Sequence, residues 1–275
     1  MVPVGGVEIG PGRPLALIAG PCVIESEDVT LRTAGFVRAV AERLDIPYIF
    51  KSSYRKDNRL SPGSYAGPGL AEGLAVLARV RTEFGVPVLS DVHCRDEIEE
   101  AAGVLDVIQI PAFLCRQTRL LEAAARTGRP LNIKKGQFLA PEDMGPIAAK
   151  AVEAGNDSVI LTERGSSFGY HNLVVDMRSI PTMRSLGFPV VFDATHSVQL
   201  PGAAGGKSGG EPEFVPVLAR AAVAAGCDAL FVETHPDPAS ALSDAGSMVP
   251  LSELERVLAG ALEVAGVVRK RGTLA

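Results

Sequence analysis

The stretch LALIAGPCVIESEDVTLRTAGFVRAVAERLDIPYIFK (residues 15–51) contains one complete strand–helix–strand unit. Its apolar runs LALIA (15–19) and YIF (48–50) have the composition of strands that are buried on both faces. Between them, SEDVTLRTAGFVRAVAERL (26–44) opens with the capping residue Ser26 and carries apolar residues at helical spacing. A helix that joins two such strands predicts a parallel sheet.

The same unit recurs along the rest of the chain. Further strand-like runs are VPVLSDV (86–92), VIQI (107–110), LNIK (131–134), SVILTE (158–163), PVVFDAT (189–195) and ALFVET (229–234). Further helical patterns lie at 70–85, 141–155, 212–226 and 251–266. Eight units in 275 residues favour an α/β fold of the closed (β/α)8 TIM-barrel type, while an open sheet stays possible because periodicity cannot show closure.

The leading segment VPVGGVEIGPGRP predicts an N-terminal β-hairpin over residues 1–14, with Gly5-Gly6 as its turn. No linker or low-complexity tract interrupts the sequence after it. We therefore expect one catalytic domain over residues 1–275.

Composition excludes several classes of protein. A net charge of -5 argues against a nucleic-acid partner held by a general basic field. No apolar run approaches the roughly 18 residues of a membrane span, and the first residues do not resemble a signal peptide. The scattered cysteines form no CxxC pair, so we expect a cytoplasmic protein without disulfides or a membrane partner.

Polar side chains follow nearly every predicted strand, where active groups of a barrel collect. One such residue is most often a solvated loop residue or a helix cap. On eight strands of a closed barrel, these groups would converge on one mouth. They are Cys22, Lys51, Asp91, His93, Gln109, Lys134, Lys135, Glu163, Arg164, Asp193, His196, Glu233 and His235.

Five cations form a first subset: Lys51, Lys56, Arg59, Lys134 and Arg164. Cations that face one cavity repel each other, and a polyanionic ligand such as a phosphorylated carboxylate would offset the repulsion. For Lys56 and Arg59, a solvated loop is the alternative.

A second subset contains Cys22, His196, Glu233 and Asp244. A thiolate, an imidazole and two carboxylates would suit a divalent metal ion of intermediate softness. The alternatives are that Cys22 is a small core residue, that Asp244 is a loop cap, and that His235 replaces His196 as a ligand.

Motifs over residues 15–267 carry a family resemblance. They are IAGPCVIES (18–26), FKSSYRKDNR (50–59), GPGLAEGL (67–74), SDVH (90–93), DVIQIPAFLCRQT (106–118), NIKKGQF (132–138), LTERGSSFGYHNLVVDMR (161–178), FDATHSVQLPG (192–202) and FVETHPDPASALSD (231–244). With these motifs the chain resembles the 3-deoxy-D-manno-octulosonate 8-phosphate synthases, also called 2-dehydro-3-deoxyphosphooctonate aldolases, and the wider 3-deoxy-arabino-heptulosonate 7-phosphate synthase group.

The resemblance implies a homotetrameric (β/α)8 transferase of lipopolysaccharide biosynthesis that condenses phosphoenolpyruvate with arabinose 5-phosphate and releases phosphate. It implies phosphoenolpyruvate contacts from Lys56, Gln109, Lys134 and Arg164, and aldose contacts from Asn58, Arg59 and Asp91. It also implies that Arg116 reaches a neighbouring subunit and that His93 lies beside the reacting carbons. Since Cys22 stands in the first motif, the chain resembles the metal-dependent class. The metal ligands of that class correspond to Cys22, His196, Glu233 and Asp244.

We also assign catalytic roles to His93, Lys134 and Asp244, and a substrate contact to Lys51.

The loop KDNRLSPGSYAG (56–67) departs from the family pattern. Leu60 replaces a serine, Gly63 a histidine and Ala66 an arginine, so a hydroxyl donor and a cation are missing near the sugar phosphate; Ser61 is the candidate that compensates for the hydroxyl. This departure leaves open a sister synthase with another aldose, such as erythrose 4-phosphate, or a phosphosugar-binding protein without activity. A Schiff-base aldolase that uses Lys134 or Lys135 is a further alternative.

Overall fold

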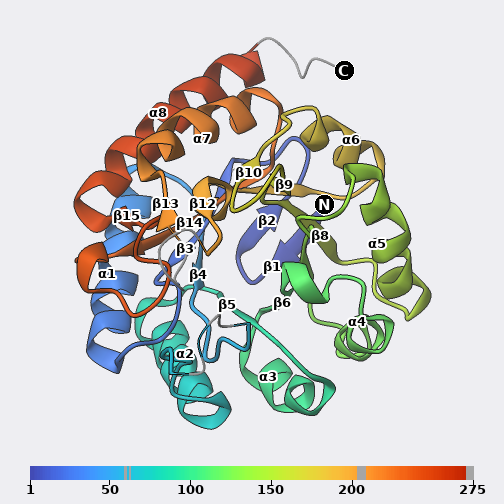
Figure 1. Cartoon of the computed structure of the whole chain (residues 1–275), viewed down its shortest axis with the longest axis vertical. Coiled ribbons are helices and arrows are strands. Elements are labelled where there is room, and N and C mark those ends of the chain that lie inside the picture. The colour runs from blue at the N-terminus through green and yellow to red at the C-terminus, as the bar shows by residue number, and fades with distance from the viewer. Residues whose placement is uncertain (59–60, 62, 203–208, 271–275) are drawn as a thin grey trace.

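Eight parallel strands form a closed barrel in the computed structural model, which describes residues 1–58, 61, 63–202 and 209–270 (Figure 1). Strand β11 pairs in parallel with both β8 and β14, and this second pairing closes the sheet. The closure confirms the predicted barrel and rules out the open sheet. The barrel strands are β3 (Ala16–Gly20), β4 (Tyr48–Lys51), β5 (Val88–Asp91), β6 (Val107–Ile110), β7 (Leu131–Lys134), β8 (Val159–Glu163), β11 (Val190–Asp193) and β14 (Ala229–His235).

Helices form an outer ring around these strands (Figure 1). The first begins as predicted, because the Ser26 side chain accepts a hydrogen bond from the Val29 N–H at 3.3 Å. The helices are α1 (Glu27–Arg43), α2 (Leu70–Phe84), α3 (Ile98–Val104), α4 (Thr118–Ala125), α5 (Met144–Glu153), α6 (Ser179–Ser185), α7 (Val215–Ala224) and α8 (Leu251–Lys270).

Alternate residues of each strand face the helices and the barrel interior. On β3 and β4, Leu17 and Phe50 pack in the outer cluster beneath the helices, whereas Ile18 and Ile49 belong to the inner cluster. The inner apolar cluster fills only the half of the barrel nearer the strand amino ends. The carboxyl-end half is left for polar side chains.

The N-terminal hairpin plugs the barrel at the amino ends of its strands. Strands β1 (Val2–Val4) and β2 (Val7–Ile9) pair antiparallel around Gly5 and Gly6, as predicted. Gly5 has φ 56°, a backbone conformation that favours glycine. Because Val2, Val4, Val7 and Ile9 all belong to the inner cluster, the hairpin seals the end opposite to the expected site.

Short additional strands lie at the carboxyl ends of the barrel strands. Strands β9 (Ser166–Ser167) and β10 (Leu173–Val174) pair antiparallel, as do β12 (Gln199–Leu200) and β13 (Gly209–Gly210). In Figure 1 they lie on the viewer's side of the barrel, and β15 (Val249–Pro250) pairs in parallel with the carboxyl end of β14. The loops that carry these short strands form part of the wall of the barrel mouth.

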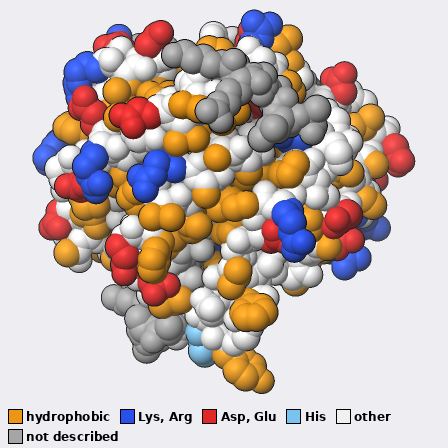
Figure 2. All heavy atoms as spheres, turned by 90° about the horizontal axis from the view of Figure 1, so that it is seen from above, with side chains coloured by type: hydrophobic (Ala, Val, Ile, Leu, Met, Phe, Trp, Pro, Cys, Tyr) orange, Lys and Arg blue, Asp and Glu red, His pale blue; other side chains and the backbone are white. Residues whose placement is uncertain are grey.

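The surface seen from the side of α7 and α8 has mixed character (Figure 2). Lys and Arg side chains alternate there with Asp and Glu side chains, and hydrophobic side chains lie between them. Within the described part of the chain, no helix has the length and apolar character needed to cross a membrane.

Candidate active site

A cavity of about 970 Å³ opens at the carboxyl ends of the strands. Loops after several different strands line it, which is the usual location of the site in a barrel of this type. The structure therefore brings most of the predicted site residues to one place. Those that line the cavity are Lys51, Lys56, Asn58, Asp91, His93, Gln109, Lys134, His196 and Asp244.

Two buried ion pairs form the floor of the cavity. Lys51 Nζ lies 2.6 Å from Glu233 Oε1 and donates to the Cys22 carbonyl at 2.9 Å. Lys134 Nζ lies 2.6 Å from Asp193 Oδ2 and 3.8 Å from the centre of the Phe231 ring. Burial lowers the pKa of Lys134, and Asp193 offsets only part of that effect. An anionic ligand bound there would compete with Glu233 and Asp193 for the two lysines.

Asp91 accepts hydrogen bonds from two neighbours. The Ser53 hydroxyl donates to Oδ2 at 2.7 Å, the Gln109 amide donates to Oδ1, and Lys56 Nζ lies 3.6 Å from Oδ2. Burial alone would raise the pKa of Asp91, but the nearby Lys56 and Lys51 cations lower it far below its usual range. Asp91 is therefore a carboxylate at neutral pH.

A chain of buried amides fixes the Gln109 side chain. Its Oε1 accepts from Asn132 Nδ2 at 2.8 Å, and Asn132 Oδ1 accepts from the Thr162 hydroxyl at 2.5 Å. Sequence reasoning missed Asn132 and Thr162. The signal was available, because Asn132 lies two residues before Lys134 and so faces the same side of β7.

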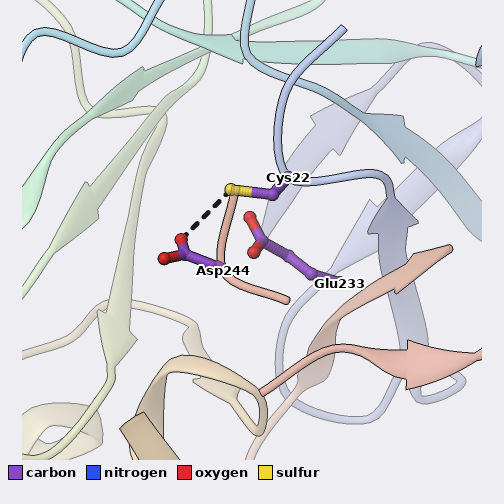
Figure 3. Close-up of side chains that lie close together, drawn as sticks. All are labelled: Cys22, Glu233 and Asp244. Carbon is purple, nitrogen blue, oxygen red and sulfur yellow. Dashed lines mark hydrogen bonds between the residues drawn. The ribbon is translucent and has the colours of Figure 1, made fainter. Parts of the chain in front are cut away.

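Cys22, Glu233 and Asp244 point toward one another in Figure 3, with ligand atoms that all lie within 4.8 Å of one another. Cys22 Sγ lies 3.1 Å from Asp244 Oδ2 and 3.0 Å from Ser243 Oγ. Asp244 has φ 49°, a left-handed conformation that is uncommon outside glycine and that aims its carboxylate at this cluster. Asp244 is thus more than a loop cap.

His196 adjoins this cluster. Its Nε2 lies 3.7 Å from Glu233 Oε2 and 3.8 Å from Asp244 Oδ2. His235, the alternative ligand, lies elsewhere: its Nδ1 accepts from the Asp237 N–H and its Nε2 lies 3.5 Å from Glu25. His196 thus lies beside Glu233 and Asp244 but outside the close group that these two form with Cys22, whereas His235 lies apart from the group.

The chemistry of this donor set fits a divalent cation. Burial, followed by the Asp244 and Glu233 carboxylates, raises the pKa of the Cys22 thiol well above its usual value. A bound cation reverses that effect and deprotonates a coordinating thiol. In addition, buried Glu233 Oε2 accepts no hydrogen bond from any residue that the structure describes. A metal ion would satisfy this oxygen.

Comparisons with known proteins agree with this geometry. A family model described as the DAHP synthetase I family matches residues 2–268. The chain belongs to the DAHP synthetase I family. Its curated relatives include the 2-dehydro-3-deoxyphosphooctonate aldolases of Pelobacter propionicus (58% identity; 97% of this chain and 98% of that protein), Trichlorobacter lovleyi (57%; 97% and 98%) and Geotalea uraniireducens (59%; 94% and 94%).

The remaining site residues predicted from the family's motifs lie at the rim or outside the described chain. Arg164 is buried beside the mouth, where its Nη2 donates to Gln199 Oε1 at 3.2 Å and its Nη1 has no hydrogen-bond partner among the described residues. Arg116 is exposed and does not line the cavity of its own chain. Arg59 and Leu60 lie outside the described residues, so their predicted roles stay predictions.

The two lysines considered for a Schiff base differ in position. Lys135 Nζ donates to Ser166 Oγ at 2.9 Å and lies 3.5 Å from Glu163, away from the cavity. Only Lys134 of the pair faces the cavity, and there it is held in the ion pair with Asp193.

Proposed function

We propose that this chain condenses phosphoenolpyruvate with arabinose 5-phosphate, forming 3-deoxy-D-manno-octulosonate 8-phosphate and inorganic phosphate. The observation that carries the proposal is the near-full-length identity of 57–59% to proteins named 2-dehydro-3-deoxyphosphooctonate aldolase. The cavity supports it, since buried lysines and carboxylates meet in one space.

The cations form the phosphoenolpyruvate half of the proposed site. Lys134, Arg164 and Lys56 would hold the carboxylate and phosphate groups, with Gln109 as a neutral donor and Lys51 beneath them. The unpaired Arg164 Nη1 is a buried donor in need of an acceptor, which a phosphate oxygen would supply. Phosphoenolpyruvate is a masked enol, so C3 can attack an aldehyde once both substrates are held in reacting geometry.

The aldose half of the proposed site lies across the cavity. Asn58, Arg59 and Asp91 would contact the sugar, and His93 would lie beside the reacting carbons. Asp91 is suited to accept hydrogen bonds from sugar hydroxyls, because its low pKa keeps it ionised. As water adds to C2 and phosphate leaves, the fixed cations would stabilise the developing negative charge.

We further propose that Cys22, His196, Glu233 and Asp244 hold a divalent metal ion, with zinc, iron and manganese as the candidates. Bound there, the ion would act as a Lewis acid toward the aldehyde or toward water. The mixed donor set and the unsatisfied Glu233 Oε2 support this assignment. Metal analysis of the purified protein, followed by rigorous removal and assay, tests it; unchanged activity without metal would refute a metal requirement.

The identity of the aldose is best tested by comparing the turnover of different aldose phosphates. Ser61, Gly63 and Ser64 line the cavity where the loop departs from the family pattern, so two hydroxyls remain near the proposed sugar-phosphate end. We expect phosphate release from phosphoenolpyruvate to be fastest with arabinose 5-phosphate. Turnover with erythrose 4-phosphate instead would assign the chain to a sister synthase, and binding without any turnover would make it a phosphosugar-binding protein.

We also propose that residues 1–275 act as one cytoplasmic catalytic domain that assembles as a homotetramer. Arg116, exposed on the loop after β6, would then reach the site of a neighbouring subunit. Phe113 on the same loop supports this arrangement, since it lines the cavity while 56% of its surface is exposed. Light scattering coupled to gel filtration measures the assembly.

A further inference from the structure

Glu97 is a buried carboxylate that joins the loops after β4 and β5. It ends the short helical turn η1 (Arg95–Glu97) before α3, and only 4% of its surface is exposed. Its Oε2 accepts from the Tyr54 hydroxyl at 2.9 Å and from the His93 N–H at 2.9 Å. Its Oε1 forms an ion pair with Arg55 Nη2 at 2.6 Å. Glu97 does not itself line the cavity.

These contacts restrain His93 from two sides. His93 Nδ1 lies 3.7 Å from Glu97 Oε2, and the Tyr54 ring meets the imidazole edge-on, with centres 6.1 Å apart and planes at 89°. Tyr54 cannot easily shift, because it is fully buried against α2, where a Cβ on Gly73 would come within 2.3 Å of the Tyr54 Cβ. The carboxylate therefore ties His93 to a rigid part of the fold.

The same carboxylate restrains the loop that carries Lys56. Arg55, the ion-pair partner of Glu97, directly precedes Lys56, and the Lys56 N–H donates to the Ala66 carbonyl at 2.8 Å. With its own N–H and the preceding side chain both held, Lys56 places its ammonium 3.6 Å from Asp91. Glu97 thus contacts Tyr54 and Arg55, which restrain the cavity residues His93 and Lys56, although Glu97 itself does not line the cavity.

Stability alone does not explain a buried charge in this position. Apolar residues of similar volume often replace a buried ion pair with little loss of stability, since burying the charges costs as much as their attraction returns. A buried carboxylate with two hydrogen bonds and one ion pair does supply fixed geometry. The direct contacts of Glu97 lie nearest His93, in the aldose half of the cavity.

We propose that Glu97 is a positioning residue that sets His93 beside Asp91 in the aldose half of the cavity. The inference rests on the proposed function for its substrates. It predicts that loss of the Glu97 charge chiefly impairs use of the aldose phosphate. The affinity for phosphoenolpyruvate should change less, because Lys56 is supported only indirectly through Arg55 and because Lys134 and Arg164 do not contact Glu97.

The test compares Glu97→Gln with Glu99→Gln, an exposed neighbour on α3. We expect Glu97→Gln to raise KM for arabinose 5-phosphate, or to lower kcat, by about tenfold, with KM for phosphoenolpyruvate within about twofold of wild type. Tyr54→Phe, which removes one hydrogen bond and keeps the ring, should shift the same parameter less. Equal increases in both KM values, or kinetics that match Glu99→Gln, would overturn the proposal.

A spectroscopic measurement keeps the proposal testable if turnover is too low or if the wild type fails to turn over any aldose. The chain has four histidines, so its imidazole ¹⁵N signals can be assigned with one variant each. In Glu97→Gln and Tyr54→Phe, the His93 signal should move while those of His171, His196 and His235 stay in place. An unmoved His93 signal contradicts positioning by Glu97, whereas absent turnover in the wild type contradicts the proposed function instead.

Discussion

Asp193 contacts groups from both predicted subsets of the site. Its Oδ2 lies 2.6 Å from Lys134 Nζ and 2.7 Å from His196 Nδ1, and its Oδ1 accepts from the His196 N–H at 2.9 Å. Burial would raise the pKa of Asp193, but His196 and Lys134 lower it far below its usual range. One ionised carboxylate therefore holds the proposed phosphoenolpyruvate lysine and a proposed metal ligand in place.

Lys134→Met separates the stabilising role of this pair from its role in activity. The single variant leaves Asp193 buried and partly unpaired, so we expect its free energy of unfolding to fall by about 3 kcal/mol. The double variant Lys134→Met/Asp193→Asn should recover part of that loss and still show at least about a hundredfold lower kcat/KM. Urea unfolding and initial rates measure both. Recovery of activity in the double variant would refute a role for the Lys134 cation.

Cys22→Ala tests the proposed metal ligand. Loss of the sulfur should weaken metal binding by more than the about 10–100-fold that loss of an outer partner costs. Elemental analysis after gel filtration should then show little metal on Cys22→Ala. The matched control is Cys94→Ala, which removes an exposed thiol and should retain wild-type metal. Equal metal content in the two variants would exclude Cys22 as a ligand.

Strand-end side chains were predictable from the sequence, and their partners were not. Cys22, Asp91, Lys134 and Glu233 each follow or end an apolar run, so the fold places them at one mouth. Which nitrogen faces which oxygen depends on contacts between strands far apart in sequence. The position of His196 rather than His235 beside Glu233 and Asp244 is such a case, because both histidines come at strand ends and only packing distinguishes them.

At the scale of elements, strand positions followed closely from apolar runs, since buried parallel strands have a simple pattern. The long helices α1, α2 and α8 were equally visible through their periodicity. Helices α3, α4 and α6 were not singled out, because 7 or 8 residues give about two turns and too few repeats to show a period. Their existence followed only from the need to cross back between parallel strands.

The N-terminal hairpin should contribute to stability without contributing to catalysis. Ile9 is fully buried at the amino end of the barrel, so Ile9→Ala should lower the free energy of unfolding by about 2–5 kcal/mol. Glu8→Ala removes only an exposed ion pair with Arg13 and should cost less than about 1 kcal/mol. Urea unfolding compares them, with kcat as a control. A selective loss of activity in Ile9→Ala would contradict the assignment of this end as a plug.

At the scale of the whole molecule, the buried carboxylates make the fold sensitive to acid. Burial would raise the pKa of Glu233, but His196 and Lys51 lower it to about 2 from the ordinary 4.5. A carboxyl group whose pKa is lower in the folded state stabilises the fold above its unfolded pKa, and loses that effect as pH falls through the folded value. The sensitive interval for Glu233 is therefore about pH 4.5 to 2.

For the metal-free protein, we expect the Glu233 contribution of about 3 kcal/mol to be lost across that interval. Urea unfolding at a series of pH values should show a steep decline in wild type and in Glu263→Gln, which alters an exposed carboxylate. Glu233→Gln should be less stable at neutral pH and decline less steeply. A decline in Glu233→Gln as steep as in wild type would show that other carboxyl groups dominate.

One barrel mouth should join phosphoenolpyruvate to an aldose phosphate. ³¹P NMR of the metal-loaded protein with phosphoenolpyruvate and arabinose 5-phosphate tests it most directly. We predict that the phosphoenolpyruvate signal disappears in step with growth of inorganic phosphate, while the sugar phosphate signal shifts to a new monoester of equal intensity. Phosphate release without the aldose, or loss of the sugar's own phosphate, would contradict the account.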